Sequence, residues 1–275
     1  MANAPKPTTV QKESSSASNL FATLVIPICI IIGVSIWKFI FGDANNFIDN
    51  NADNLPKVGN YAGMAFKGGP IVAVLVGMFL MVIVFSVERF IVIGKATGTS
   101  SLDAFVKKIQ ALLSSNNIEA AISECDKQKG SVANVIKSGL KKYREMEVEA
   151  NMDTDQKCLA IQKDIEEATT LEMPMLEQNL TVIATLVSVG TLVGLLGTVT
   201  GMIKAFGGLA NSGAPDSAAL ATGISEALIN TATGIGTSTL AIIMYNILTS
   251  KIDKLTYAID EAGFSIIQTY ASTHK

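Results

Sequence analysis

The sequence of 275 residues has few of the side chains on which enzymes and metal sites depend. Its single histidine is His274, and its three cysteines, Cys29, Cys125 and Cys158, do not have the spacing of a metal site. Three cysteines in this arrangement also argue against a disulfide framework. Hydrolytic and metal chemistry therefore have no candidate residues, and we expect no enzyme activity, no metal and no cofactor.

Charge is also scarce. Charged residues make up 16% of the sequence, the net charge is −3 and the isoelectric point is near 5.3. This balance provides no basic face for nucleic acid, which excludes that class of partner. Hydrophobic residues make up 49% of the chain and the mean hydropathy is +0.40, which is typical of a protein in a lipid bilayer.

Long apolar runs fit this interpretation. Each is at or above the roughly 20 residues that cross the hydrocarbon core as a helix. The four runs are 20–41, 70–93, 180–206 and 218–248. The first two are rich in Ile and Val and the last two in Gly, Ala and Thr, so the second pair is predicted to pack against protein and the first pair to face lipid. The sequence predicts an all-α, polytopic helical membrane protein.

Lysine and arginine residues predict the orientation, because positively charged loops stay on the cytoplasmic side. Segment 94–178 is rich in them, whereas the connection 207–217 has none. Segment 94–178 and both termini are therefore predicted to be cytoplasmic. The first run has a second interpretation as a cleaved signal peptide, because Lys6 and Lys12 precede it. Its length and the lack of a clear cleavage site favour a retained helix.

The cytoplasmic segment has helical periodicity from residue 101 to residue 178, with a turn expected at Gly130. It is predicted to be an inserted helical domain. From about Thr154 the apolar pattern continues to the third run with only Pro174 to interrupt it. This predicts a long helix that continues from the cytoplasm into the membrane and bends at Pro174.

The third run contains glycines at spacings that place them along one side of a helix. These are Gly190, Gly194, Gly197 and Gly201. Small residues let membrane helices approach closely, so the glycines predict a packing surface. Thr191 and Thr198 have two interpretations, because a threonine hydroxyl either donates to the carbonyl four residues earlier or points into a polar cavity.

The fourth run has one polar face. Its residues are Thr222, Glu226, Asn230, Thr233 and Thr237, with Thr231 beside Asn230. A charged carboxylate near the bilayer centre costs roughly 2.5–3.5 kcal/mol, so Glu226 either faces a bundle interior or lies near the outer surface. No intramembrane partner for Glu226 is expected, and Lys204 is predicted to extend to the interface.

These segments are similar to the paired membrane helices of the MotA/TolQ/ExbB proton channel family, in its ExbB and TolQ branch. The resemblance lies in "VGLLGTVTGMIKAFGGLA" and "ATGISEALINTATGIGTSTLAIIMYN" and extends more weakly to "GGPIVAVLVGMFLMVIVFSVERFIVIGKA". The helix at 20–41 is additional to the usual three-helix plan. Where the family commonly has proline before G-T-V, this sequence has Thr191.

The resemblance implies a homopentameric ring in the bacterial inner membrane. Its pore would hold the single helix of an ExbD- or TolR-like partner, which supplies an intramembrane aspartate. The family's pore threonines correspond to Thr198 and Thr231, and its helix glutamate to Glu226. The residues expected to line the pore or proton pathway are Thr191, Thr198, Glu226, Asn230, Thr231 and Thr233.

The expected domain organisation follows the chain. It has a disordered cytoplasmic tail (1–19), an extra transmembrane helix with a periplasmic loop (20–69), a transmembrane helix (70–94), the cytoplasmic helical domain (95–178), two pore-lining transmembrane helices (179–250) and a cytoplasmic C-terminal helix (251–275).

The function implied is the use of the proton motive force to drive TonB-dependent outer-membrane transport through a TonB-like protein. A TolQ-like motor for envelope integrity is the alternative within the family, and the modest cytoplasmic insert disfavours a MotA-like motility role. Two alternatives from other classes stay open. A solute permease would need more binding groups or an inverted repeat, and a passive membrane scaffold would have no use for the polar face.

Overall fold

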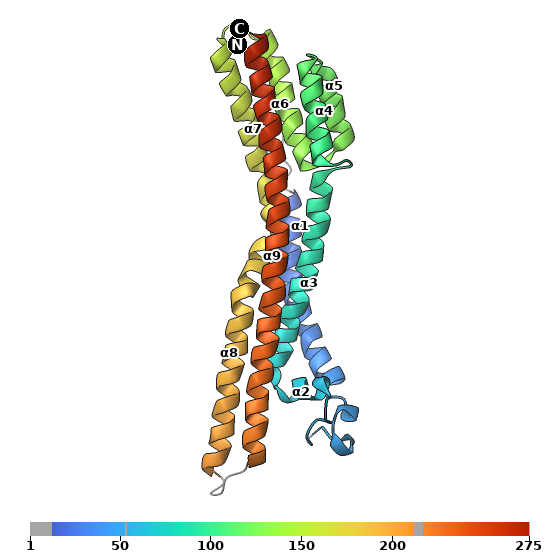
Figure 1. The fold of residues 1–275 in the computed structure, drawn as a ribbon, viewed down its shortest axis with the longest axis vertical. Coiled ribbons are helices and arrows are strands. Elements are labelled where there is room, and N and C mark those ends of the chain that lie inside the picture. The colour runs from blue at the N-terminus through green and yellow to red at the C-terminus, as the bar shows by residue number, and fades with distance from the viewer. Residues whose placement is uncertain (1–12, 53, 212–216, 275) are drawn as a thin grey trace. The chain divides into compact units, whose positions relative to one another are not determined.

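The structure, a computed structural model, describes residues 13–52, 54–211 and 217–274 (Figure 1). Within these ranges every regular element is a helix, apart from an isolated antiparallel bridge between Phe47 and Pro56. Four stretches are long and apolar enough to span a membrane: Leu20–Phe41, Pro70–Ser114, Leu180–Gly207 and Leu220–Thr273. The prediction of an all-helical chain with four apolar spans is confirmed. Most of the tail predicted at 1–19 lies outside the described residues.

The chain divides into two compact units. The first unit contains Met1–Val84 and Val182–Ile242, and the second contains Phe85–Thr181 and Ile243–Lys275. Helices α3 (Pro70–Thr97) and α9 (Ser217–Thr273) contribute residues to both. The C-terminal helix predicted at 251–275 is part of α9, which is continuous over 57 residues.

The first unit begins with α1 (Glu13–Ser35), which continues into a π-helical turn, Ile36–Phe41. Two short 3-10 turns, Ala44–Asn46 and Ile48–Asn50, and α2 (Tyr61–Lys67) follow. A small aromatic cluster stabilises this segment: the Trp37 and Phe66 rings stack with centroids 4.7 Å apart, and the fully buried Phe47 meets Phe66 edge-on.

Helix α1 packs against α3 where two glycines face each other. A Cβ atom on Gly33 would lie 2.7 Å from the Cα of Gly77, and one on Gly77 would lie 3.0 Å from the Cα of Ile30. Only residues without a side chain fit such a crossing, which is how membrane helices associate without a hydrophobic driving force.

The second unit contains four further helices: α4 (Leu102–Ser114), α5 (Ile118–Gln128), α6 (Gly130–Val148) and α7 (Thr154–Glu177). Side chains of Ser101, Asn117 and Asp153 accept from backbone N–H groups at the starts of α4, α5 and α7. Large apolar side chains form its core, among them Ile109, Ile136, Leu140, Tyr143, Ile161, Ile266 and Tyr270.

The prediction of one helix bent at Pro174 is wrong. Helix α7 continues past Pro174 to Glu177, and α8 (Leu180–Asn211) begins three residues later. Between them Gln178 is non-helical and Asn179 has a φ of 62°. Asparagine tolerates this left-handed conformation better than most residues, so the chain breaks there and not at the proline.

Arg89 stabilises the end of α7. It is 2% exposed, forms an ion pair with Glu88, and donates to the backbone oxygens of Met175 (3.0 Å) and Leu176 (3.4 Å). The last carbonyls of a helix have no partner within the helix, so the guanidinium replaces the bonds that the break removes.

Candidate functional site

Helices α8 and α9 run side by side in the first unit and meet along their glycines (Figure 1). The predicted packing glycines of α8, Gly190, Gly194, Gly197 and Gly201, are all buried. A Cβ on Gly194 would lie 3.0 Å from the Cα of Gly234, and one on Gly201 would lie 3.1 Å from the backbone oxygen of Gly223. The obstacles are backbone atoms of α9, so the two helices approach as closely as their backbones allow.

The hydroxyl groups of Thr198 and Thr231 meet across this contact. Both residues are half-buried. Thr198 Oγ1 also lies 3.2 Å from the Gly194 oxygen, and Thr231 Oγ1 lies 3.2 Å from the Ala227 oxygen. Each hydroxyl has one proton and several acceptors, so the donor within the pair can change without a change of backbone.

A second hydroxyl contact lies one heptad away. Thr191 Oγ1 donates to Ser238 Oγ at 2.9 Å. Sequence reasoning did not single out Ser238, although it follows Thr231 by seven residues just as Thr198 follows Thr191. The equal spacing of seven residues on two antiparallel helices was the signal that could have predicted the Thr191–Ser238 contact. Thr233, by contrast, donates to the Ile229 oxygen of its own helix at 2.8 Å.

Glu226 and Asn230 face the segment that precedes α3. The fully buried amide of Asn230 donates to the Gly68 oxygen at 3.0 Å. Glu226 Oε1 lies 2.8 Å from Lys204 Nζ, with the Glu226 side chain 12% exposed and that of Lys204 60% exposed. The expectation that Glu226 lacks a partner within the chain is wrong, because its carboxylate forms an ion pair with Lys204. That Lys204 extends to the interface stays a prediction.

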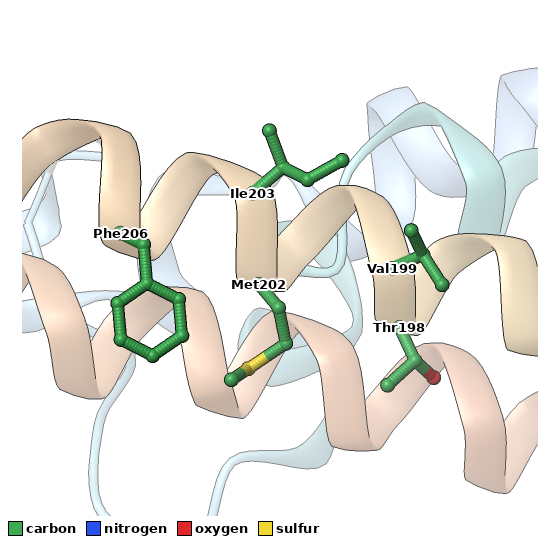
Figure 2. A pocket seen from close by; sticks show the side chains of 5 residues that line it. All are labelled: Thr198, Val199, Met202, Ile203 and Phe206. Atoms are coloured by element: carbon green, nitrogen blue, oxygen red, sulfur yellow. The ribbon is translucent and has the colours of Figure 1, made fainter.

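A shallow open hollow on α8 lies beside the Thr198–Thr231 pair. Its lining residues are Thr198, Val199, Met202, Ile203 and Phe206. Figure 2 shows Thr198, Met202 and Phe206 on one side of α8, as their spacing of four requires. The threonine hydroxyl is the only polar side-chain group among the five. The hollow therefore offers an apolar surface with one hydroxyl at its edge.

Among the described residues, no group of three or more histidine, cysteine, aspartate or glutamate side chains is placed to hold a metal ion. The polar groups at the contact of α8 with α9 include the two hydroxyl contacts, the ion pair and the Asn230 amide. Hydroxyl and carboxyl groups of this kind bind and pass protons but supply no nucleophile with an adjacent base. The arrangement is that of a polytopic helical membrane protein with a polar contact inside a glycine-packed helix pair.

Comparison with known proteins extends this assignment. The model of the MotA/TolQ/ExbB proton channel family matches residues 127–261, which include α6, α7, α8 and most of α9. Through this region the chain is similar to the MotA/TolQ/ExbB proton channel family. The family is one of membrane proton channels and not of enzymes.

Relatives carry the names of two branches. The Tol-Pal system protein TolQ of Pseudomonas aeruginosa is 28% identical over 155 residues, which cover 56% of this chain and 67% of the relative. The biopolymer transport protein ExbB of Salmonella typhimurium is 39% identical over 70 residues, 26% of this chain and 29% of the relative. A putative ExbB-like protein of Synechocystis is 33% identical over 88 residues, 31% of this chain and 42% of the relative. The chain thus matches less than half the length of these two ExbB relatives.

Proposed function

We propose that this chain is the channel subunit of a proton-driven motor in the bacterial inner membrane. With a single-helix partner of the ExbD type, it would convert the proton motive force into mechanical work for TonB-dependent outer-membrane transport. The observation that carries the proposal is the contact of the Thr198 and Thr231 hydroxyls between two glycine-packed helices. The match of residues 127–261 to a proton channel family supports it.

The hydroxyl pair suits proton transfer to and from a carboxylate. Each threonine accepts and donates, and the acceptors within reach belong to Gly194 and Ala227. The partner's intramembrane aspartate would supply the group that changes charge. A membrane potential provides about 2.3 kcal/mol per elementary charge per 100 mV, so a few protons are sufficient to move the partner helix.

Exposed apolar side chains on α8 support a ring of several copies, which we propose to be a homopentamer around the partner. They include Leu192, Leu195, Leu196, Val199, Ile203 and Phe206. In a membrane such surfaces contact acyl chains, neighbouring copies or a partner helix. The hollow beside Thr198 would place the partner's carboxylate next to the hydroxyl pair (Figure 2).

A TolQ-like role in envelope integrity is the second candidate. The match to the TolQ protein of Pseudomonas aeruginosa favours this role, because it extends over 155 residues. The match to the ExbB protein of Salmonella typhimurium has a higher identity but extends over only 70 residues. Mass spectrometry of the single-helix protein that co-purifies with this chain distinguishes the two roles.

The proposed function is tested by replacing Thr231 with valine, which keeps the shape of the side chain and removes the hydroxyl. We expect Thr231→Val to abolish uptake by TonB-dependent outer-membrane transport, which the proton motive force drives, while the oligomer still assembles. The matched control is Thr200→Val. Within the described part of the chain, the Thr200 hydroxyl donates to carbonyl oxygens of its own helix alone, those of Leu196 and Gly197. Energised uptake that survives in Thr231→Val would remove Thr231 from the path.

Two further outcomes would favour other classes of protein. Uptake that is insensitive to proton uncouplers would favour a passive scaffold. Accumulation of a solute by this chain alone in liposomes would favour a permease.

A further inference from the structure

The turn between α2 and α3 lies directly against the ion pair of α8 and α9. Gly69 has a φ of +78°, a conformation that favours glycine. A Cβ atom at this position would lie 2.8 Å from Glu226 Oε1 and 3.9 Å from Lys204 Nζ. The backbone of Gly69 therefore approaches the carboxylate more closely than any other residue type permits.

Asn230 fixes the neighbouring residue of the same turn. Its Nδ2 group donates to the Gly68 oxygen and to the Glu226 backbone oxygen, each at 3.0 Å. The orientation of the amide follows from these bonds, because a flipped amide would place Oδ1 against two carbonyl oxygens. Since Asn230 is fully buried, water does not replace these bonds when the side chain is removed.

Oxygen Oε1 of Glu226 thus lies against both a cation and a backbone turn. Lys204 is the only charged group within the described residues that is paired with it, at 2.8 Å. Asn230, one helical turn along α9, holds the turn in place. Three segments meet here: the turn before α3, the last part of α8 and the first part of α9.

We propose that Lys204 and Asn230 are positioning residues that hold Glu226 as a fixed anion against the Gly68–Gly69 turn. Glu226 then anchors these three segments and does not carry protons along the path. This inference rests on the proposed function, because it assigns the proton path to Thr198 and Thr231 and removes Glu226 from it.

The alternative is that Glu226 is itself a proton carrier. A carrier has to lose and regain its charge in each cycle, which breaks the ion pair with Lys204 each time and leaves the ammonium without its partner. An anchor keeps its charge throughout. The two roles of Glu226 can be distinguished by experiment. An anchor requires a pair of opposite charges at positions 204 and 226, whereas a proton carrier requires the carboxylate at position 226.

A charge exchange separates these roles. The variants are Lys204→Glu, Glu226→Lys and the double variant with both changes, each expressed with its partner. Recovery of the assembled complex, its thermal midpoint in detergent and proton-driven activity are measured for each. The control is Lys163→Glu, which breaks the exposed pair of Lys163 with Glu167.

We expect each single exchange to lower assembly and to reduce activity roughly tenfold or more, because it places two like charges side by side, and the double variant to restore both to within about threefold of the parent. The control is expected to change neither. An assembled double variant without activity would overturn the inference, because the carboxylate at position 226 would then be required. Activity of Lys204→Glu equal to that of the control would also overturn it.

A second pair of changes covers the case in which the exchanged charges do not assemble. Lys204→Met combined with Glu226→Met replaces the ion pair by apolar side chains and leaves no unpaired charge. Retained activity in this double variant supports the anchor, and an assembled but inactive complex overturns it. If the proposed function itself were wrong, the result would be different, because Thr231→Val would then be active.

Discussion

The two units of this chain hold their helices together in different ways. In the first unit, α8 and α9 are in contact through glycine, so that Gly194 of one helix faces Gly234 of the other. In the second unit, α6 and its neighbours bury large side chains, with Ile136, Leu140 and Tyr143 no more than 1% exposed. Burial of a large apolar side chain stabilises a water-soluble core by about 1.5–3 kcal/mol, a gain that lipid does not offer.

This difference in packing determines where polar side chains can meet between helices. A glycine contact brings backbones together and leaves room for the hydroxyls of Thr198 and Thr231 to meet. In the core of large side chains, buried polar groups such as those of Arg89 and Gln128 bond to backbone oxygens instead. The unit with the weaker hydrophobic contribution is therefore the one that contains the candidate site.

The exclusion of water from the second unit is tested by Cys125. Burial raises the pKa of its thiol from 9.0 to about 12, so at pH 8 the reactive thiolate is roughly a thousandfold rarer than for an ordinary cysteine. We expect alkylation of Cys125 in the native protein at pH 8 to be slower by about this factor than after unfolding. Because the folded-state pKa is the higher one, the contribution of this thiol to stability is present below pH 9 and is lost as the pH rises toward 12.

The alkylation is followed by mass spectrometry at several pH values, with Cys158, which is half-buried, as the internal comparison. Native labelling of Cys125 at the rate of the unfolded chain would mean that the core of the second unit is open. The contrast between the units would then be lost.

Arg89 is a buried charge among the large side chains of the second unit. We expect Arg89→Met to destabilise the unit by about 3–5 kcal/mol, since Glu88 and the α7 carbonyls lose their partner. Denaturation in detergent followed by circular dichroism measures the change. Arg144→Met is the control, because the exposed pair of Arg144 with Glu119 is worth about 0–1 kcal/mol. Equal losses of stability in the two variants would show that the Arg89 contacts contribute no more than an exposed ion pair.

The glycine contact of the first unit is tested by adding one methyl group. A Cβ on Gly234 would lie 2.7 Å from the Gly190 oxygen and 2.8 Å from the Gly194 Cα, so Gly234→Ala forces the backbones apart. We expect a loss of about 1–3 kcal/mol, measured as a lower thermal midpoint of the complex in detergent. Gly236→Ala is the matched control on the same helix, because nothing lies within 4 Å of a Cβ there. A midpoint for Gly234→Ala that matches the control would contradict close backbone packing.

Much of this architecture follows from the sequence. Hydropathy predicts the four spans, helical periodicity predicts the amphipathic helices of residues 101–178, and the resemblance places Thr198 and Thr231 together. The break at Gln178–Asn179 escapes prediction, because an asparagine in a left-handed conformation leaves no trace in the apolar pattern that continues across it.

The ion pair was within reach of sequence reasoning and was missed. Once Thr198 lies opposite Thr231 on antiparallel helices, moving six residues along α8 and five back along α9 brings Lys204 to Glu226. The Gly68–Gly69 turn was not within reach, because nothing local to the sequence specifies which distant side chains a glycine turn will meet.

The central claim is that the hydroxyls of Thr198 and Thr231 face the helix of the partner protein inside a homo-oligomeric ring of this chain. Its most direct test is an experimental structure of this chain with the single-helix protein that co-purifies with it. The claim predicts that the partner's carboxylate lies within hydrogen-bond distance, directly or through one water, of Thr198 or Thr231. Both hydroxyls facing acyl chains, or sealed within one subunit away from the partner, would contradict it.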